Sequence, residues 1–172
     1  MSLSVRESGI TFSPFDEARF YYIEKSGSYN RLGKNFSTVE FIFMNRKNQL
    51  CFVEVKSSSP RQNGSPGQFE TWITKVVSKF CDSLQLFLAV YTERRAEPCL
   101  GGAIRHADIK TLPMKFILII PNHRPEWLAP IQNELKRCLY KTTAMWNIDV
   151  AVMNENFAKE YGMICREKST ST

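Results

Sequence analysis

Apolar residues along the chain fall into short β-like runs and longer helical stripes. Residues 38–44 (TVEFIFM) and 50–56 (LCFVEVK) are two β-rich runs joined by NRKNQ, a five-residue polar loop. This arrangement predicts a β-hairpin. Apolar runs at 115–120 (KFILII) and 148–154 (IDVAVMN) predict two further strands.

Apolar residues at helical spacing predict a long helix after residue 65. Ser65 could cap it, Pro66 suits the first helical position, and Gln68 would complete a Ser-x-x-Gln capping box. The apolar stripe of this helix consists of Phe69, Ile73, Val76, Phe80, Leu84 and Phe87. A second helical region is expected over residues 124–146, interrupted or restarted at Pro130.

The remaining segments complete the order of elements. Residues 13–26 fit a helix or a strand equally well, residues 57–67 form a loop, and residues 93–113 are irregular with room for one short strand. A short helix should end at Gly162. The order predicts one α/β domain over residues 1–172, with frayed tails at 1–12 and 166–172.

Composition and charge narrow the class of protein. A chain of 172 residues suits one domain, and its net charge of +6 with a pI of about 9.1 favours a polyanionic partner such as nucleic acid. Five cysteines without CxxC spacing make a zinc site unexpected and suit a reducing cytoplasm. No apolar run is long enough to span a bilayer, so we expect no membrane partner and a cytoplasmic location.

Charged residues interrupt the apolar strands of the predicted hairpin. Glu54 and Lys56 are two residues apart, so both side chains should leave the same face of the sheet. If the five-residue loop closes the hairpin, Glu40 lies directly opposite Glu54, with Cβ atoms about 5 Å apart. A four-residue loop would slip the pairing by one and put the two glutamates on opposite faces.

Two carboxylates this close require a compensating cation. Repulsion would raise the pKa of one of them unless a positive charge lies between, and Mg²⁺ or Mn²⁺ suits their oxygens better than Lys56 does. The alternative is a solvated surface hairpin with a Glu–Lys pair. Both strands are apolar on both faces, however, which favours buried, central strands.

The motif TVEFIF, then FVEVKSS, then a long helix, resembles the PD-(D/E)XK nuclease superfamily. The resemblance implies a restriction-endonuclease-like fold, in which a mixed central β-sheet is flanked by helices. It also implies Mg²⁺- or Mn²⁺-dependent hydrolysis of phosphodiester bonds in DNA, or less commonly RNA. Glu40 after Val39 stands where the family usually has an aspartate after a proline. The alternative is therefore a catalytically decayed module of this fold that binds nucleic acid or a protein partner.

The same resemblance assigns roles to residues. Glu40, Glu54 and the backbone carbonyl of Val55 would bind the metal, and Lys56 would orient or activate the attacking water. Many members add an acidic residue from a preceding segment, for which Glu24 is preferred over Glu17. Many also cleave duplexes as dimers, so a homodimer is a further expectation.

Polar and basic residues near the motif are candidate substrate contacts. QFETW resembles the Gln-x-x-x-Tyr motif of exonuclease-like members, and the edge of the helix that starts with Gln68 carries two lysines. Such groups bind phosphates without reading sequence. The candidates are Ser57, Arg61, Gln68, Lys75 and Lys79. The alternative is a capping role for Gln68 and a solvated lysine edge.

Overall fold

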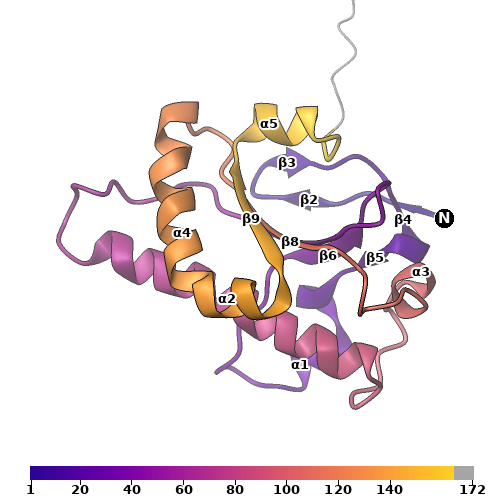
Figure 1. The fold of residues 1–172 in the computed structure, drawn as a ribbon. Coiled ribbons are helices and arrows are strands. Elements are labelled where there is room, and N and C mark those ends of the chain that lie inside the picture. Colours follow the sequence, from indigo (N-terminus) through magenta and orange to yellow (C-terminus); the bar gives the residue numbers. More distant parts are fainter. Residues whose placement is uncertain (165–172) are drawn as a thin grey trace, which may run out of the picture.

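The structure is a computed structural model, and it describes residues 1–164 (Figure 1). The strands are β1 (Ser2–Leu3), β2 (Arg6–Glu7), β3 (Ile10–Thr11), β4 (Phe15–Asp16), β5 (Phe20–Tyr21), β6 (Phe41–Met44), β7 (Leu50–Val55), β8 (Met114–Ile119) and β9 (Ile148–Met153). The helices are α1 (Gly27–Asn30), α2 (Gln68–Tyr91), α3 (Gly102–Arg105), α4 (Pro125–Trp146) and α5 (Glu155–Glu160), with short 3₁₀ turns η1 (Glu17–Arg19) and η2 (Ile23–Lys25).

A five-stranded mixed sheet forms the centre of the molecule, in the order β5-β6-β7-β8-β9. The pairs β5–β6 and β6–β7 are antiparallel, whereas β7–β8 and β8–β9 are parallel. Helix α2 connects β7 to β8, and α4 connects β8 to β9 (Figure 1). The predicted α/β domain with a central sheet flanked by helices is confirmed.

The register of the β6–β7 hairpin is the one that the five-residue loop predicts. Met44 is paired with Leu50, and Phe41 with Val53. Glu40 lies one residue before β6, and its backbone N–H donates a hydrogen bond of 3.0 Å to the carbonyl of Val53. The alternative register, which would separate Glu40 and Glu54 onto opposite faces, is therefore wrong.

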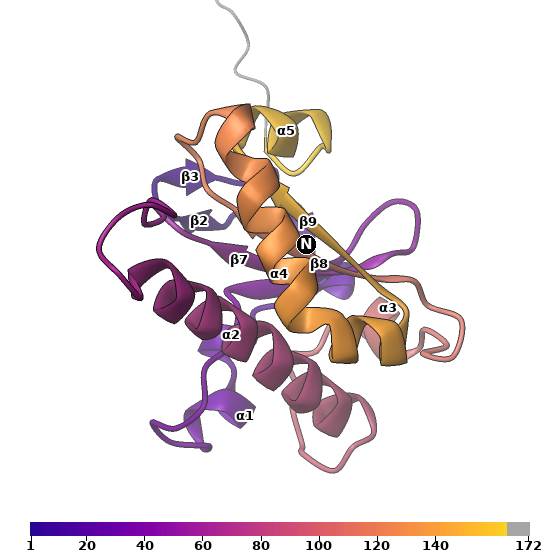
Figure 2. The same ribbon diagram turned by 60° about the vertical axis from the view of Figure 1, so that its left-hand side comes forward.

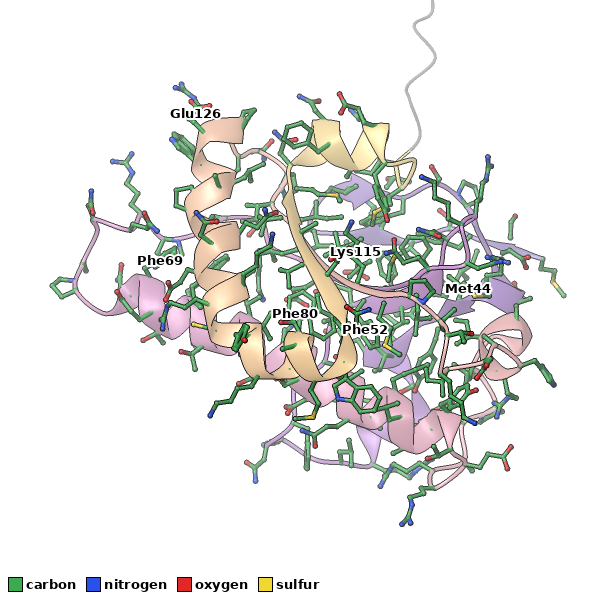
Figure 3. The ribbon with its side chains drawn as sticks, viewed as in Figure 1. Met44, Phe52, Phe69, Phe80, Lys115 and Glu126 are labelled. Carbon is green, nitrogen blue, oxygen red and sulfur yellow. The ribbon has the colours of Figure 1, made fainter. Side chains whose placement is uncertain are left out.

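One face of the sheet packs against α2 and α4, which cross in front of it in Figure 2. The aromatic rings of the sheet and α2 interlock there. Phe80 of α2 and Phe52 of β7 are labelled in Figure 3. Phe80 stacks on Phe116 of β8 with ring centroids 4.7 Å apart, and Phe52 contacts Phe116 edge to face at 5.4 Å. Such burial of large rings is a major source of the stability that holds α2 over β7.

The other face is covered by the N-terminal strands, by α5 and by residues 163–164. Residues 1–12, predicted to be a frayed tail, are folded instead. Ser8 and Gly9 both have positive φ, and they close a two-residue hairpin between β2 and β3. The hairpin lets Val5, Ile10 and Phe12 bury their side chains on this face, and that burial explains why the segment is ordered. The predicted tail at 166–172 lies outside the described residues.

Several element boundaries differ from the predicted ones. Residues 13–26 are neither one helix nor one strand, but β4, η1, β5 and η2 in succession. Helix α2 begins at Gln68 after Gly67, whose φ of 79° ends the preceding loop, so Ser65 is not its cap. The region 93–113 contains the helix α3 and no strand.

Helix α4 continues through Pro130 without a break. A proline at this position removes one backbone hydrogen bond, yet Leu128, Ile131, Leu135 and Leu139 are buried along one side of the helix. Their packing against the sheet outweighs the lost bond, so the predicted interruption is wrong. Within residues 1–164, no helix has the length and apolar character needed to cross a membrane.

Candidate functional site

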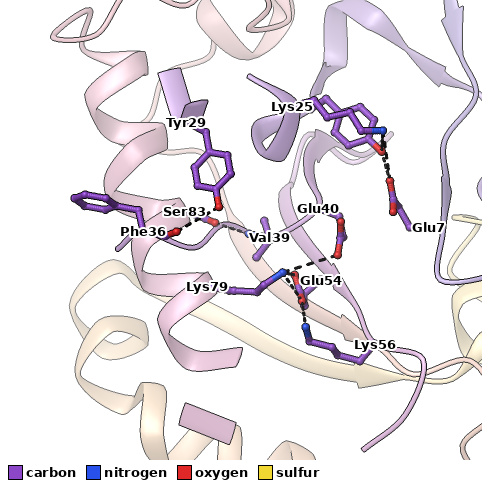
Figure 4. Close-up of polar contacts among 11 residues, drawn as sticks. Glu7, Lys25, Tyr29, Phe36, Val39, Glu40, Glu54, Lys56, Lys79 and Ser83 are labelled. Atoms are coloured by element: carbon purple, nitrogen blue, oxygen red, sulfur yellow. Dashed lines mark hydrogen bonds and ion pairs between the residues drawn. The ribbon is translucent and has the colours of Figure 1, made fainter. Parts of the chain in front are cut away.

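The carboxyl end of β7 carries Glu54 and, directly after the strand, Lys56. Side chains alternate between the two faces of a strand, and Leu50 and Phe52 face α2. Glu54 and Lys56 continue this series at every second residue, so they lie on the same face. Glu40 precedes β6 with the same parity as Ile42, which also faces α2. The structure thus brings Glu40, Glu54 and Lys56 to one face, as the sequence predicted (Figure 4).

Glu54 is fully buried, at 0 % exposure, and two lysines neutralise it. Its Oε1 lies 2.8 Å from Nζ of Lys56 and 2.9 Å from Nζ of Lys79, which also donates to Oε2 at 3.1 Å. A buried carboxylate is tolerated when it is paired in this way. Lys79, predicted as a substrate contact, instead reaches from α2 into the centre of the site.

Lys79 bridges the two glutamates. Its ammonium lies 3.9 Å from Oε1 of Glu40 while it also contacts Glu54 (Figure 4). Burial by itself lowers the pKa of Lys79, but the charge of Glu54 and the hydrogen bond to it outweigh burial and raise this pKa above its usual value. The cation that two close carboxylates require is therefore supplied by the chain itself.

The surroundings of Glu40 disfavour its ionised form, and Lys79 compensates for this only in part. Burial first, then a hydrogen bond with Glu24, and then the charge of Glu54 raise the pKa of Glu40 from 4.5 to about 8. Lys79 opposes this rise. Glu24, the acidic residue expected from a preceding segment, thus lies beside Glu40.

A third acidic residue, Glu7, completes this group. Glu7, Glu24 and Glu40 each offer a carboxylate oxygen, and the three atoms lie within 4.8 Å of one another. Glu7 also contacts the hydroxyl of Tyr22 and lies 3.9 Å from Nζ of Lys25 (Figure 4). Glu7 is not among the predicted site residues, because residues 1–12 were expected to form a frayed tail. The Ser8–Gly9 dipeptide was the available sign of a hairpin there.

Helix α2 also holds the backbone that leads to Glu40. Oγ of Ser83 accepts a hydrogen bond of 2.8 Å from the N–H of Val39, and Oδ2 of Asp82 accepts one of 3.0 Å from the N–H of Ser37. Both Ser83 and Val39 are buried. These bonds satisfy backbone groups just before β6, and they fix the position from which Glu40 enters the site.

An open hollow of about 680 Å³ lies beside the first turns of α2. Two of the predicted substrate contacts, Gln68 and Lys75, line it, whereas Ser57 and Arg61 are exposed and lie outside its lining. The full lining is Ser58, Ser59, Pro60, Pro66, Gly67, Gln68, Thr71, Trp72 and Lys75. Because Lys75 is one helical turn before Lys79, the hollow leads toward the carboxylates.

The loop that borders this hollow contacts the segment that follows β8. Oγ of Ser59 lies 2.5 Å from Nε2 of His123, and burial lowers the pKa of His123. His123 also contacts the ring of Trp127 edge to face, with centroids 5.6 Å apart. This contact anchors one side of the hollow.

The donor set suits a hard divalent cation. Two oxygens bound to one Mg²⁺ lie at most about 4.2 Å apart, and the oxygens of Glu7, Glu24 and Glu40 lie within 4.8 Å of one another, so small side-chain movements would bring them to one ion. A cation there would oppose the effects of burial and of the Glu54 charge, both of which raise the pKa of Glu40. Val55 lies between Glu54 and Lys56, with its side chain buried on the opposite face, so only its backbone could contribute.

A scan against models of known protein families, a search of curated proteins and a search of solved structures each found no match.

Proposed function

We propose that the protein is a divalent-metal-dependent nuclease with a restriction-endonuclease-like fold, hydrolysing phosphodiester bonds of DNA in preference to RNA. One observation carries the proposal: Glu40, Glu54 and Lys56 come together on one face at the carboxyl end of a central strand. A buried carboxylate pair beside a lysine and an open, partly basic hollow is the arrangement that phosphodiester hydrolysis needs.

The metal in this proposal is Mg²⁺ or Mn²⁺. Glu40 would hold it together with Glu54, with Glu24 and Glu7 close enough to contribute. The carbonyl of Val55 stays a predicted ligand. A bound cation of this kind supplies Lewis-acid polarisation of the phosphate and a more acidic water.

The other residues bind and orient the substrate. Lys56, half-buried and fixed by Glu54, is placed to stabilise the negative charge that builds up on the phosphate oxygens. Lys75 and the N-terminus of α2, which border the hollow, suit neighbouring phosphates of the strand. Trp72 in the same hollow offers a ring on which a base can stack.

The second candidate is a non-catalytic module of the same fold that binds nucleic acid or a protein. Lys79 favours this candidate, because its ammonium already occupies the space between Glu40 and Glu54. The two candidates differ in metal binding. A nuclease should bind Mn²⁺ in calorimetry at micromolar to millimolar concentration, whereas a decayed site should not.

Cleavage of plasmid, linear duplex and single-stranded DNA with Mg²⁺ or Mn²⁺ tests the proposed function. Lys56→Ala should lower cleavage by roughly 10²–10⁴-fold, the usual cost of losing one positioned electrostatic or acid–base group. DNA binding should change little, since one phosphate contact among several is a small share of the affinity. Glu54→Gln, which keeps the side-chain volume, should abolish both cleavage and Mn²⁺ binding.

Lys136→Ala is the matched control, because Lys136 is exposed on α4 and distant in sequence from the site residues. It should leave cleavage unchanged. If Lys56→Ala and Glu54→Gln cleave as fast as the wild type, the activity arises elsewhere and the assignment is wrong. The homodimer stays a prediction, and light scattering with and without a duplex would test it.

A further inference from the structure

A second hollow lies at the other end of the sheet from Glu54 and Lys56. It has a volume of about 1110 Å³ and is enclosed by residues 13–16, the hairpin loop 45–49, and residues 159–164 at the end of α5. Lys115 of β8 and Met44 of β6, both labelled in Figure 3, also line it. At about 3.3 Å per strand residue, the start and end of β7 are roughly 17 Å apart, so this cleft is separate from the carboxylate site.

The cleft is rich in positive charge. Its lining contains five basic residues and two acidic ones, namely Arg19, Arg46, Lys47, Lys115 and Lys159 against Asp16 and Glu160. Arg19 and Lys115 are half-buried. Within residues 1–164, neither of them forms an ion pair with a carboxylate. Half-buried cations that form no ion pair favour an anionic ligand.

Arg19 is held in place by uncharged groups. Its Nε donates to the carbonyl of Met44 at 3.1 Å, and its Nη2 donates to the carbonyl of Asn45 and, at 2.7 Å, to Oδ1 of Asn48. These three acceptors leave the guanidinium charge unneutralised while fixing its position. A planar cation fixed in this way is well suited to bind a phosphate.

A polar and aromatic wall faces these cations. Tyr161 donates a hydrogen bond of 2.9 Å to Oε1 of Gln49 and accepts one of 3.3 Å from Nδ2 of Asn45. Nζ of Lys115 lies 5.4 Å from the centroid of the Tyr161 ring. The buried rings of Phe15 and Phe43 add apolar surface to the same cleft. The cleft therefore offers fixed hydrogen-bonding groups, aromatic surface and positive charge together.

We propose that this cleft binds a phosphate ester of nucleotide size. Small-molecule sites commonly enclose about 300–1000 Å³, so the cleft can hold a nucleotide. Arg19 and Lys115 would contact the phosphate groups, and the ring of Tyr161 with its apolar neighbours would contact the base. A free nucleotide and the terminal nucleotide of a nucleic acid share this chemistry. The proposal is independent of the proposed nuclease function.

Isothermal titration calorimetry with ADP in metal-free buffer tests the proposal. Lys115→Gln should weaken ADP binding about tenfold or more, the usual effect of losing one charge-assisted hydrogen bond. Lys115 is preferred to Arg19 for the test, because Arg19 also ties down the hairpin loop. Lys136→Gln, the matched loss of an exposed charge on α4, should leave ADP binding unchanged.

Two further measurements make the test decisive. Lys75→Gln should not change ADP binding, because Lys75 lines the hollow beside α2. The second ligand is a 5′-phosphorylated dT5 strand. If it binds more tightly than ADP, and if Lys115→Gln weakens its binding, the phosphate that the cleft recognises belongs to the end of a nucleic acid. The proposal is overturned if neither ligand binds at millimolar concentration, or if Lys75→Gln and not Lys115→Gln weakens binding.

Discussion

Glu40 is the residue whose ionisation most directly tests the geometry of the site. An unfolded glutamate titrates near 4.5, whereas burial, the hydrogen bond with Glu24 and the charge of Glu54 raise the folded pKa of Glu40 to about 8. Between these values the folded state keeps a proton that the unfolded state has lost. The contribution of Glu40 to stability is therefore fully present below 4.5, and it is lost as the pH rises toward 8.

We accordingly expect Glu40→Gln to stabilise the metal-free protein, by an amount that grows as the pH rises from about 5 to about 8. Urea unfolding of both proteins in EDTA, at several pH values, would measure it. Glu17→Gln, at an exposed glutamate, should show no such trend and serves as the control. An equal gain at every pH would mean that repacking, and not the charge of Glu40, causes the effect.

The position of Lys79 between the two glutamates could not be predicted from the sequence. Spacing on a predicted helix placed it on a polar edge with Gln68 and Lys75, and the sequence gives no distance between that helix and the hairpin strands. Only the packing of α2 on β7 reveals that the Lys79 ammonium reaches Glu54. The glutamates and Lys56 could be predicted because a strand's period of two residues fixes their common face.

The bridging position of Lys79 implies competition with a metal cation. Lys79→Met should lower the stability of the metal-free protein by about 3–5 kcal/mol, because it leaves a buried carboxylate poorly paired. The same change should tighten Mn²⁺ binding at least about tenfold, since a unit charge at about 4 Å is worth on the order of 1–4 kcal/mol. Calorimetry with Mn²⁺ and urea unfolding would measure the two effects.

Lys75→Met is the matched control for this pair of measurements. Lys75 is exposed one turn earlier on α2, so its loss should change neither stability nor Mn²⁺ affinity appreciably. Weaker Mn²⁺ binding in Lys79→Met would contradict the idea that the ammonium and the metal compete for the same carboxylates.

Among the elements, α2 positions the site from two directions. Its Lys79 enters the carboxylate pair, and its Ser83 binds the backbone of Val39 immediately before Glu40. The helix therefore fixes both the cation and one of the acids. A change on α2 far from any substrate should alter the site through Glu40.

Ser83→Ala tests this coupling. It leaves the buried N–H of Val39 without an acceptor, which should cost about 1–3 kcal/mol of stability. It should also weaken Mn²⁺ binding, because the backbone that carries Glu40 loses its anchor. Ser78→Ala, at an exposed position of the same helix, controls for the higher helix propensity of alanine. Unchanged Mn²⁺ affinity in Ser83→Ala would show that β6 alone positions Glu40.

Elements with a long apolar pattern could be predicted, and short ones could not. The stripe of α2 follows from helical periodicity, β8 and β9 follow from apolar runs of six residues or more, and the hairpin register follows from the length of its loop. The strands β1 to β5 have two residues each, too few for a period, and they are held by contacts with distant parts of the chain. Glu7 was missed for that reason. An interruption of α4 was predicted at Pro130, because local sequence does not reveal the tertiary packing that keeps the helix continuous there.

At the scale of the whole molecule, the net charge of +6 should govern DNA binding. Without metal, a fluorescently labelled duplex should bind at low salt. If about four phosphates are neutralised, a fourfold rise in salt should weaken binding roughly 150-fold, as counter-ions are no longer released as favourably. Fluorescence anisotropy at several salt concentrations would measure the slope.

Lys75→Gln should reduce that slope by about one ion, because it removes one phosphate contact. Lys136→Gln provides the comparison for a lysine outside the hollow beside α2. Binding that does not depend on salt, or no binding at 50 mM salt, would argue for a protein partner instead of DNA.

The two ends of the described chain meet on one face of the sheet, with consequences for the order of events during synthesis. Phe12 pairs with Ile164, and the N–H of Ser13 donates to the carbonyl of Met163. The hairpin that carries Glu7 packs on the face that these contacts close. A ribosome must therefore have made residue 164, and released it from the exit tunnel, before Glu7 can settle beside Glu24 and Glu40. The acidic group should therefore be the last part of the site to form.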